Sequence, residues 1–125
     1  MTQPLFEMID VDVAFHLKDG TYKALDGISF EIQQNEIVGI VGESGCGKSL
    51  TSLTMMNLLH RSSERTAGKM RLNGKVLNEQ TDWHQIRGNE MAMIFQEPMT
   101  ALNPLMTIGK QMTESLKQHT NLSKN

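Results

Sequence analysis

The segment that decides the fold is "GESGCGKS", Gly42 to Ser49. It matches the pattern G-x-x-x-x-G-K-[ST], a glycine-rich loop that surrounds phosphate groups. The apolar run "EIVGIV", Glu36 to Val41, precedes it and is typical of a strand covered on both faces. From Lys48 to about His60 there is no proline or glycine, which favours a helix. Its apolar stripe would comprise Leu50, Leu53, Met56, Asn57, Leu58 and Leu59.

Each position of this loop has a chemical reason. Gly42, Gly45 and Gly47 allow positive φ, which brings backbone N–H groups close to phosphate oxygens. The first amides of the following helix are unpaired, and its dipole favours anions. Lys48 can reach the β- and γ-phosphates, and the Ser49 hydroxyl suits Mg²⁺. The predicted nucleotide-binding set comprises Gly42, Glu43, Ser44, Gly45, Cys46, Gly47, Lys48, Ser49 and Leu50. The alternative is a glycine-rich turn that only caps a helix.

Two strands are predicted before the loop. Apolar residues alternate with Asp10 and Asp12 over residues 9–15, which is the period of a half-buried strand. The polar stretch "HLKDGTYK" then predicts a turn, and residues 28–33 alternate in the same way as the first strand.

The segments after the helix mix strands with one further helix. "RSSERTAG", residues 61–68, is predicted to be a loop, and "KMRLNGKVL" a hairpin that turns at Asn73-Gly74. "MAMIF", residues 91–95, is a second candidate for a buried strand. A helix is expected to present Ile108, Met112, Ser115, Leu116 and His119 on one face. Strands mixed with single helices indicate an α/β layered fold.

Length and composition limit the class of protein. The chain has 125 residues, the size of one domain, with 38% hydrophobic and 21% charged residues. A formal net charge of −2 without a basic cluster does not favour nucleic-acid binding. The N-terminus has no signal-peptide pattern, and no apolar run approaches the length of a membrane span. We therefore expect a cytosolic setting, with any membrane contact made through another protein.

Cysteine, histidine and methionine do not predict a separate site. Cys46 is a single cysteine at a free position of the glycine-rich loop, so a small residue that fits there is favoured over a redox role. The histidines, at positions 16, 60, 84 and 119, lack metal-ligand spacing and are expected at the surface. Five methionines are expected in the core, namely Met55, Met56, Met91, Met93 and Met112.

A second segment makes the prediction more specific. "VGESGCGKSLTSL" together with "MAMIFQEPMTALNPLMTIG" resembles the ATP-binding subunit of an ABC transporter, in the branch of oligopeptide, dipeptide, nickel and glutathione importers. The resemblance covers essentially the whole chain. It implies a P-loop NTPase fold of the ABC type, truncated to an N-terminal part with an antiparallel β-subdomain and the start of a parallel core.

The resemblance assigns roles to residues outside the phosphate loop. Gln96 corresponds to the family's Q-loop glutamine, which ligates Mg²⁺ or holds the attacking water, so Lys48 and Gln96 are the catalytic candidates, and Ser49 and Gln96 the metal ligands. The loop 97–104, restricted by Pro98 and Pro104, would face a membrane permease subunit. Alternatively, Gln96 is an ordinary polar residue at a strand end.

An aromatic residue is expected to stack on the adenine. Phe15 is the first candidate on the family resemblance and Tyr22 the second, although Phe15 could equally be a core residue. The expected segments are β-subdomain strands at 1–35, the Walker A strand, loop and helix at 36–60, a hairpin and connector at 61–90, the Q-loop strand and loop at 91–104, and the start of a helical subdomain at 105–125.

The resemblance implies ATP with Mg²⁺, a second ATP-binding subunit, and a peripheral position at the cytoplasmic face of the membrane through permease subunits. A Walker B carboxylate pair, a signature motif and a switch histidine would follow the Q-loop, and the sequence shows none of them. We therefore expect an N-terminal half of a cassette, a fragment of low stability and inactive alone. The alternatives are a non-catalytic nucleotide-binding remnant and a cassette ATPase of DNA repair or translation.

Overall fold

The computed structural model describes residues 3–43, 45, 47–96 and 102–120. The chain forms two compact units, Met1–Thr81 and Asp82–Asn125, and each is described here by itself.

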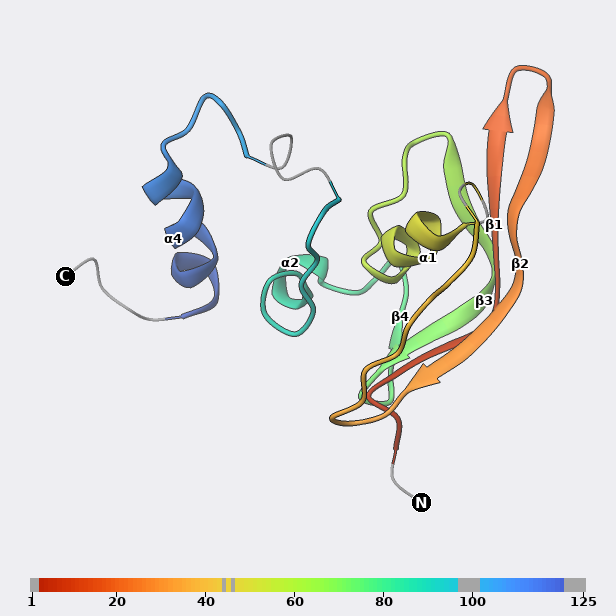
Figure 1. Cartoon of the computed structure of the whole chain (residues 1–125), viewed down its shortest axis with the longest axis horizontal. Coiled ribbons are helices and arrows are strands. Elements are labelled where there is room, and N and C mark those ends of the chain that lie inside the picture. Colours follow the sequence, from red (N-terminus) through yellow and green to blue (C-terminus); the bar gives the residue numbers. More distant parts are fainter. Residues whose placement is uncertain (1–2, 44, 46, 97–101, 121–125) are drawn as a thin grey trace. The chain divides into compact units, whose positions relative to one another are not determined.

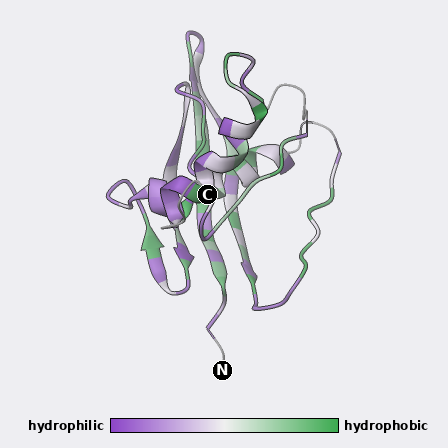
Figure 2. Ribbon diagram, turned by 90° about the vertical axis from the view of Figure 1, so that its left-hand side faces the viewer, coloured by the Kyte–Doolittle hydropathy of each residue, from purple (hydrophilic) through white to green (hydrophobic). Residues whose placement is uncertain are grey.

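The first unit is built on a four-stranded antiparallel sheet (Figure 1). Its spatial order is β2-β1-β3-β4, so β1 lies between β2 and β3. Hydrophobic and hydrophilic residues follow one another along the strands, as expected of a sheet with one face on a core (Figure 2). The strands are β1 (Phe6–Leu17), β2 (Gly20–Ile32), β3 (Ser63–Leu72) and β4 (Lys75–Leu77).

Both predicted N-terminal strands and the predicted hairpin are confirmed. The turn of that hairpin is formed by Asn73 at φ 51° and Gly74 at φ 80°, the left-handed values that a two-residue turn requires. The predicted loop at 61–68 is wrong, because β3 begins at Ser63 and pairs with β1 along its length. Its polar composition concealed a strand whose side chains are mostly exposed.

Helix α1 (Lys48–Met55) follows the glycine-rich loop and is shorter than predicted. It ends where Asn57 adopts φ 53°. The Leu58 N–H donates to the Leu53 carbonyl at 2.8 Å and the Asn57 N–H to the Thr54 carbonyl at 3.1 Å. These two bonds form a Schellman motif, in which a left-handed residue closes the last turn.

The buried face of α1 differs from the predicted leucine stripe. Its buried residues are Thr51 and Thr54, whose hydroxyls donate to the carbonyls of Gly47 and Leu50 one turn earlier. Met56 is buried as predicted, whereas Leu58 is exposed. The core of this unit comprises Phe6, Met8, Val11, Val13, Ala14, Leu25, Met56, Met70, Leu72 and Leu77.

The predicted buried strand at 36–41 is absent. Residues 36–43 form no strand (Figure 1), and Ile37 is 99% and Val41 93% exposed. A strand covered on both faces needs neighbouring strands to satisfy its amides and carbonyls. Among the described residues the sheet is entirely antiparallel, and none of its strands pairs with this run.

The second unit holds α2 (Trp83–Ile86) and α4 (Ile108–His119). The predicted C-terminal helix is therefore confirmed, but none of its residues is buried, and Met112 is exposed rather than in the core. The strand predicted at 91–95 is reduced to one parallel bridge between Arg87 and Met91, and Ile94 is 97% exposed. In the part of the chain that the structure describes, no helix is long and apolar enough to cross a membrane.

Candidate nucleotide-binding site

The glycine-rich loop leads into α1 through two left-handed glycines. Gly45 has φ 83°, and Gly47 is the N-cap of α1 with φ 99° and ψ 9°. The Thr51 N–H and hydroxyl both donate to the Gly47 carbonyl, at 2.9 and 2.8 Å, which fixes the first turn. A side chain at Gly47 would be strained by this backbone conformation, so the sequence can place the helix start here only with glycine.

The same glycine allows close contact between the loop and the sheet. A Cβ atom added to Gly47 would lie 2.8 Å from Cδ2 of Leu25, which is buried on β2. The loop therefore lies directly against the sheet face that carries Leu25. Sequence analysis did not single out Leu25, because the contact joins residues far apart in the chain and no local pattern signals it.

The basic side chain of the loop is directed back onto the loop. The Lys48 ammonium group donates to the carbonyl oxygen of Gly42, at the start of the loop. The first amides of α1 lack partners within the helix, and its first turn carries no acidic residue. This combination of free amides, helix dipole and ammonium group attracts phosphate. Ser44 and Cys46, which belong to the predicted set, lie outside the described residues.

The two aromatic candidates are neighbours. Phe15 on β1 and Tyr22 on β2 are register partners, so their side chains lie on one face of the sheet. Phe15 follows Val13 by two residues, and Val13 pairs with Leu25. The aromatic pair is thus on the face against which the glycine-rich loop lies, and Tyr22 is 51% exposed. Stacking of either aromatic residue on a planar base stays a prediction.

Gln96 belongs to the second unit and is exposed. Its predicted position beside Lys48 and the metal therefore remains a prediction. Residues 97–101, with Pro98, lie outside the described residues.

The described end of that loop is attached to α4. Gln111 accepts from the Asn103 N–H at 2.8 Å, and its amide donates to the carbonyls of Asn103 and Met106 at 2.9 and 3.0 Å. Thr107 caps the helix by accepting from the Lys110 N–H. Sequence analysis missed Gln111. The threonine N-cap was the local signal for the helix start, but nothing in the sequence pointed to the hydrogen bonds between Gln111 and Asn103.

The charged groups near the β1–β2 hairpin stabilise the sheet. The Gly27 N–H donates to Asp12 Oδ1 at 2.7 Å and, with the Lys23 ammonium group 3.4 Å from Oδ2, lowers the pKa of Asp12. Asp12 and Asp26 in turn raise the pKa of Lys23. His16 is 2.8 Å from Glu64 on β3. Among the described residues no group of three or more acidic, histidine or cysteine side chains could hold a metal ion.

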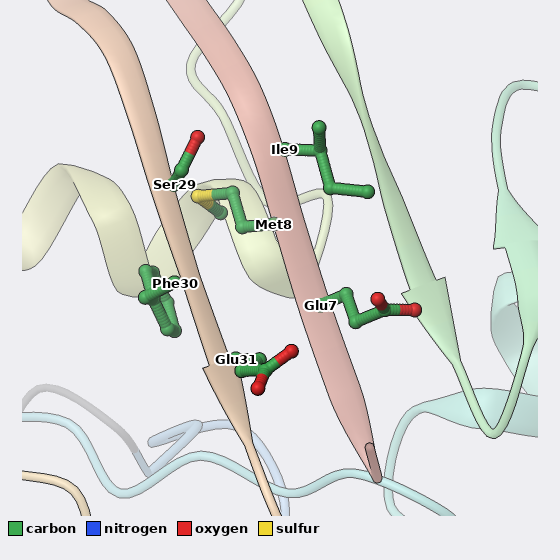
Figure 3. A pocket seen from close by; sticks show the side chains of 6 residues that line it. All are labelled: Glu7, Met8, Ile9, Ser29, Phe30 and Glu31. Atoms are coloured by element: carbon green, nitrogen blue, oxygen red, sulfur yellow. The ribbon is translucent and has the colours of Figure 1, made fainter. Parts of the chain in front are cut away.

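A shallow depression of about 250 Å³ lies between β1 and β2 (Figure 3). None of its lining residues belongs to the glycine-rich loop or to the aromatic pair. They are Glu7, Met8, Ile9, Ser29, Phe30 and Glu31.

Comparison with known proteins identifies the family. The model of the ABC transporter family matches residues 25–125, which include the glycine-rich loop, α1 and Gln96. The chain belongs to the ABC transporter family.

Curated relatives are similar across nearly the whole chain. The chain is 46% identical over 123 residues to the oligopeptide transport ATP-binding protein AppD of Bacillus subtilis, covering 96% of this chain and 38% of that protein. It is 41% identical over 119 residues to the dipeptide transport ATP-binding protein DppD of Lactococcus lactis, covering 94% and 34%. A probable peptide ABC transporter ATP-binding protein of Sinorhizobium fredii is 38% identical over 123 residues, covering 96% and 37%.

The chain thus spans little more than a third of the length of the curated relatives it matches. The family and the P-loop NTPase fold follow from this similarity.

Proposed function

We propose that this chain is the nucleotide-binding part of an ATP-binding component that energises import of peptides or a related small solute through an ABC transporter. The observation that supports the proposal is the close approach of Gly47, at the end of the glycine-rich loop, to Leu25, on the sheet face that also carries Phe15 and Tyr22. The relatives are oligopeptide and dipeptide transport ATP-binding proteins, which supports peptides as the solute class.

Different residues bind different parts of the nucleotide. The backbone amides between Gly42 and Leu50 bind the phosphates, and Lys48 balances their charge once it leaves the Gly42 carbonyl. Phe15, with Tyr22 as its neighbour, stacks on the adenine. Catalysis in phosphoryl transfer consists mostly of positioning and electrostatic stabilisation, which these groups supply in the complete cassette.

A magnesium ion fits the residue types present. The hydroxyl of Ser49 and the amide oxygen of Gln96 are hard oxygen donors of the kind Mg²⁺ takes, and Ser49 lies in the first turn of α1 beside Lys48. When bound, the ion would neutralise charge on the phosphate oxygens. Ser49 and Gln96 would hold it, and Gln96 would orient the attacking water.

The partners follow from the same assignment. We infer that a second ATP-binding subunit completes the hydrolytic site and that permease subunits contact the loop 97–104. The component would therefore act at the cytoplasmic face of the membrane.

The second candidate function is a non-catalytic nucleotide-binding protein. The exposed run 37–41 favours it, because the loop is then not anchored by a buried strand on its N-terminal side. This candidate differs from the first in turnover and not in binding.

Thermal unfolding with Mg-ATP tests the binding proposal. A ligand at about one hundred times its Kd stabilises the folded state by about 2.7 kcal/mol. For a domain of this size we expect a rise in Tm of about 10 °C. Lys48→Ala should abolish the rise in Tm. The matched control Lys75→Ala, at an exposed position of β4, should retain it.

Equal Tm shifts for wild type and Lys48→Ala would overturn the proposal. Phosphate release that depends on Lys48 would favour the enzyme over the second candidate.

A further inference from the structure

Around Asp10, the central strand of the sheet locally carries one residue more than either of its neighbours. Between the pairs Met8–Phe30 and Val11–Ile28, β1 has two residues and β2 only Ser29. On its other side, the pairs Ile9–Lys69 and Asp12–Ala67 enclose two residues of β1 and only Gly68 of β3. Asp10 lies in both intervals and has φ 47°, so it is the extra residue of a bulge toward both neighbours.

The bulge changes which side chains of β1 face the core. Before it, the even-numbered Met8 is buried, and Figure 3 shows Glu7 and Ile9 on the opposite side of the strand. After it, Val11 and Val13 are buried, and so is the small Ala14. His16 lies 2.8 Å from Glu64, the register partner of Ala14, so Ala14 and His16 lie on one face of the strand. Phe15 therefore shares the other face with Val13. If Asp10 instead continued the regular alternation without a bulge, Val11, Val13 and Phe15 would all lie on the face away from the glycine-rich loop.

Contacts from both neighbouring strands hold the bulge in place. From β2, the Ser29 hydroxyl oxygen accepts from the Asp10 N–H at 2.9 Å, and the hydroxyl donates to Asp10 Oδ1 at 3.2 Å. Figure 3 shows Ser29 on β2 beside Met8 of β1, just before the bulge. From β3, Gly68 has φ 84°, and a Cβ there would lie 2.4 Å from the Asp10 carbonyl oxygen. These are backbone atoms of a central strand, which cannot easily move aside.

We propose that Asp10, Ser29 and Gly68 are positioning residues that hold Phe15 and Tyr22 on the loop face of the sheet, and that they thereby make the site prefer a nucleotide over its phosphate chain alone. The inference rests on the proposed nucleotide site and deepens it. Bulges are frequent beside binding sites because they redirect a side chain. Here the redirected side chain is the one that would stack on the base.

The test compares the affinities of the 125-residue chain for Mg-ATP and for Mg-tripolyphosphate, measured by calorimetry. The ratio of the two affinities measures how much the base and sugar contribute to binding. A merely structural variant would weaken both ligands and leave the ratio unchanged. Gly68→Ala should lower the ratio about tenfold, the effect of losing one base–aromatic stack. Ser29→Ala, which removes the two side-chain bonds but leaves the backbone free of clashes, should lower it about threefold.

Gly74→Ala is the matched control. Its φ of 80° is close to the 84° of Gly68, but an added Cβ would meet only the flexible side chain of Gln3. We expect its affinity ratio to equal that of the wild type. In a background that carries both Phe15→Ala and Tyr22→Ala, Ser29→Ala should no longer change the ratio, because the bulge acts through the aromatic pair.

The outcomes separate the two levels of the proposal. If the wild type binds neither ligand, the nucleotide site itself is overturned, and this inference with it. If the wild type prefers Mg-ATP but Ser29→Ala and Gly68→Ala keep its ratio, the positioning role is overturned while the nucleotide site stands. Should Gly68→Ala fail to fold, Ser29→Ala decides between these results.

Discussion

Strand β1 and the run 37–41 are both rich in apolar residues, but only β1 is paired and buried. Val11 and Val13 are completely buried, whereas Ile37 and Val41 are almost completely exposed. β1 pairs with strands on both sides, while no strand among the described residues pairs with 37–41. The difference shows that an apolar run becomes a strand only where neighbours complete its hydrogen bonds.

The largest expected effect comes from a charge placed in the paired region. Val13→Asp buries a carboxylate without a partner and should cost on the order of 5 kcal/mol or more, enough to unfold a domain at the lower end of ordinary stability. Circular dichroism should show no cooperative thermal transition. Val41→Asp should change the free energy of unfolding by less than about 0.5 kcal/mol. A cooperative melt for Val13→Asp would contradict the comparison.

A cavity in the paired region should have the next largest effect. Leu25→Ala removes a buried side chain that contacts the glycine-rich loop, and we expect a loss of about 3 kcal/mol in urea unfolding. The control Ile40→Ala alters a half-exposed side chain and should cost less than about 1 kcal/mol. Equal costs would show that the run 37–41 is as well packed in solution as β2.

The two left-handed asparagines give a smaller difference. Asn57 closes α1 with two capping bonds at φ 53°, and Asn35 lies at φ 61° in the turn that precedes the unpaired run. Asn57→Val should cost about 1–2 kcal/mol, because a β-branched residue strains a left-handed position. Asn35→Val should cost less, since the turn leads into an unpaired segment that can relax. The urea midpoints of the two variants test this order, which a larger loss for Asn35→Val would reverse.

The smallest expected effect is on the pH dependence of stability. The Gly27 amide, followed by Lys23, lowers the pKa of Asp12 in the folded state below its ordinary 3.8. Stability from this group is therefore present above the unfolded pKa and is lost as pH falls through the lower folded pKa. Asp12→Asn should be less stable than wild type at pH 7, and the difference should vanish under more acidic conditions.

Urea midpoints between pH 7 and pH 3 measure this effect. Asp26→Asn is the control, because that carboxylate is 81% exposed and lies 3.5 Å from the same lysine. A difference between wild type and Asp12→Asn that stays constant with pH would argue against the assignment.

Local signals predicted much of the first unit. Asn73-Gly74 forms its turn from its own φ preferences, and Lys48 begins a helix after Gly47 because only that glycine fits the N-cap. The sequence alternation placed Ile9 on the face of Val11, which is wrong, because the bulge at Asp10 depends on Ser29 and Gly68 in other strands. Long-range partners of this kind leave no periodic signal.

The candidate site was predicted unevenly for the same reason. The phosphate-binding loop is a contiguous motif, so its residues could be named from the sequence alone. Choosing between Phe15 and Tyr22 required the strand register, which makes them partners rather than alternatives. The relation of Gln96 to the loop depends on strand pairing that the described residues do not contain, and it stays a prediction.

The attachment of Asn103 to Gln111 has a mechanical consequence. The amide side chain of Gln111 on α4 makes two hydrogen bonds to Asn103, at the end of the loop, and one to Met106, so these segments should move as one rigid unit. A displacement of Asn103 would therefore be transmitted to α4 as a rotation of the helix axis, and would not be absorbed by bending of the loop. Amide hydrogen exchange at residues 102–107 would reveal the uncoupling, since Gln111→Ala should raise exchange there and leave the middle of α4 unchanged.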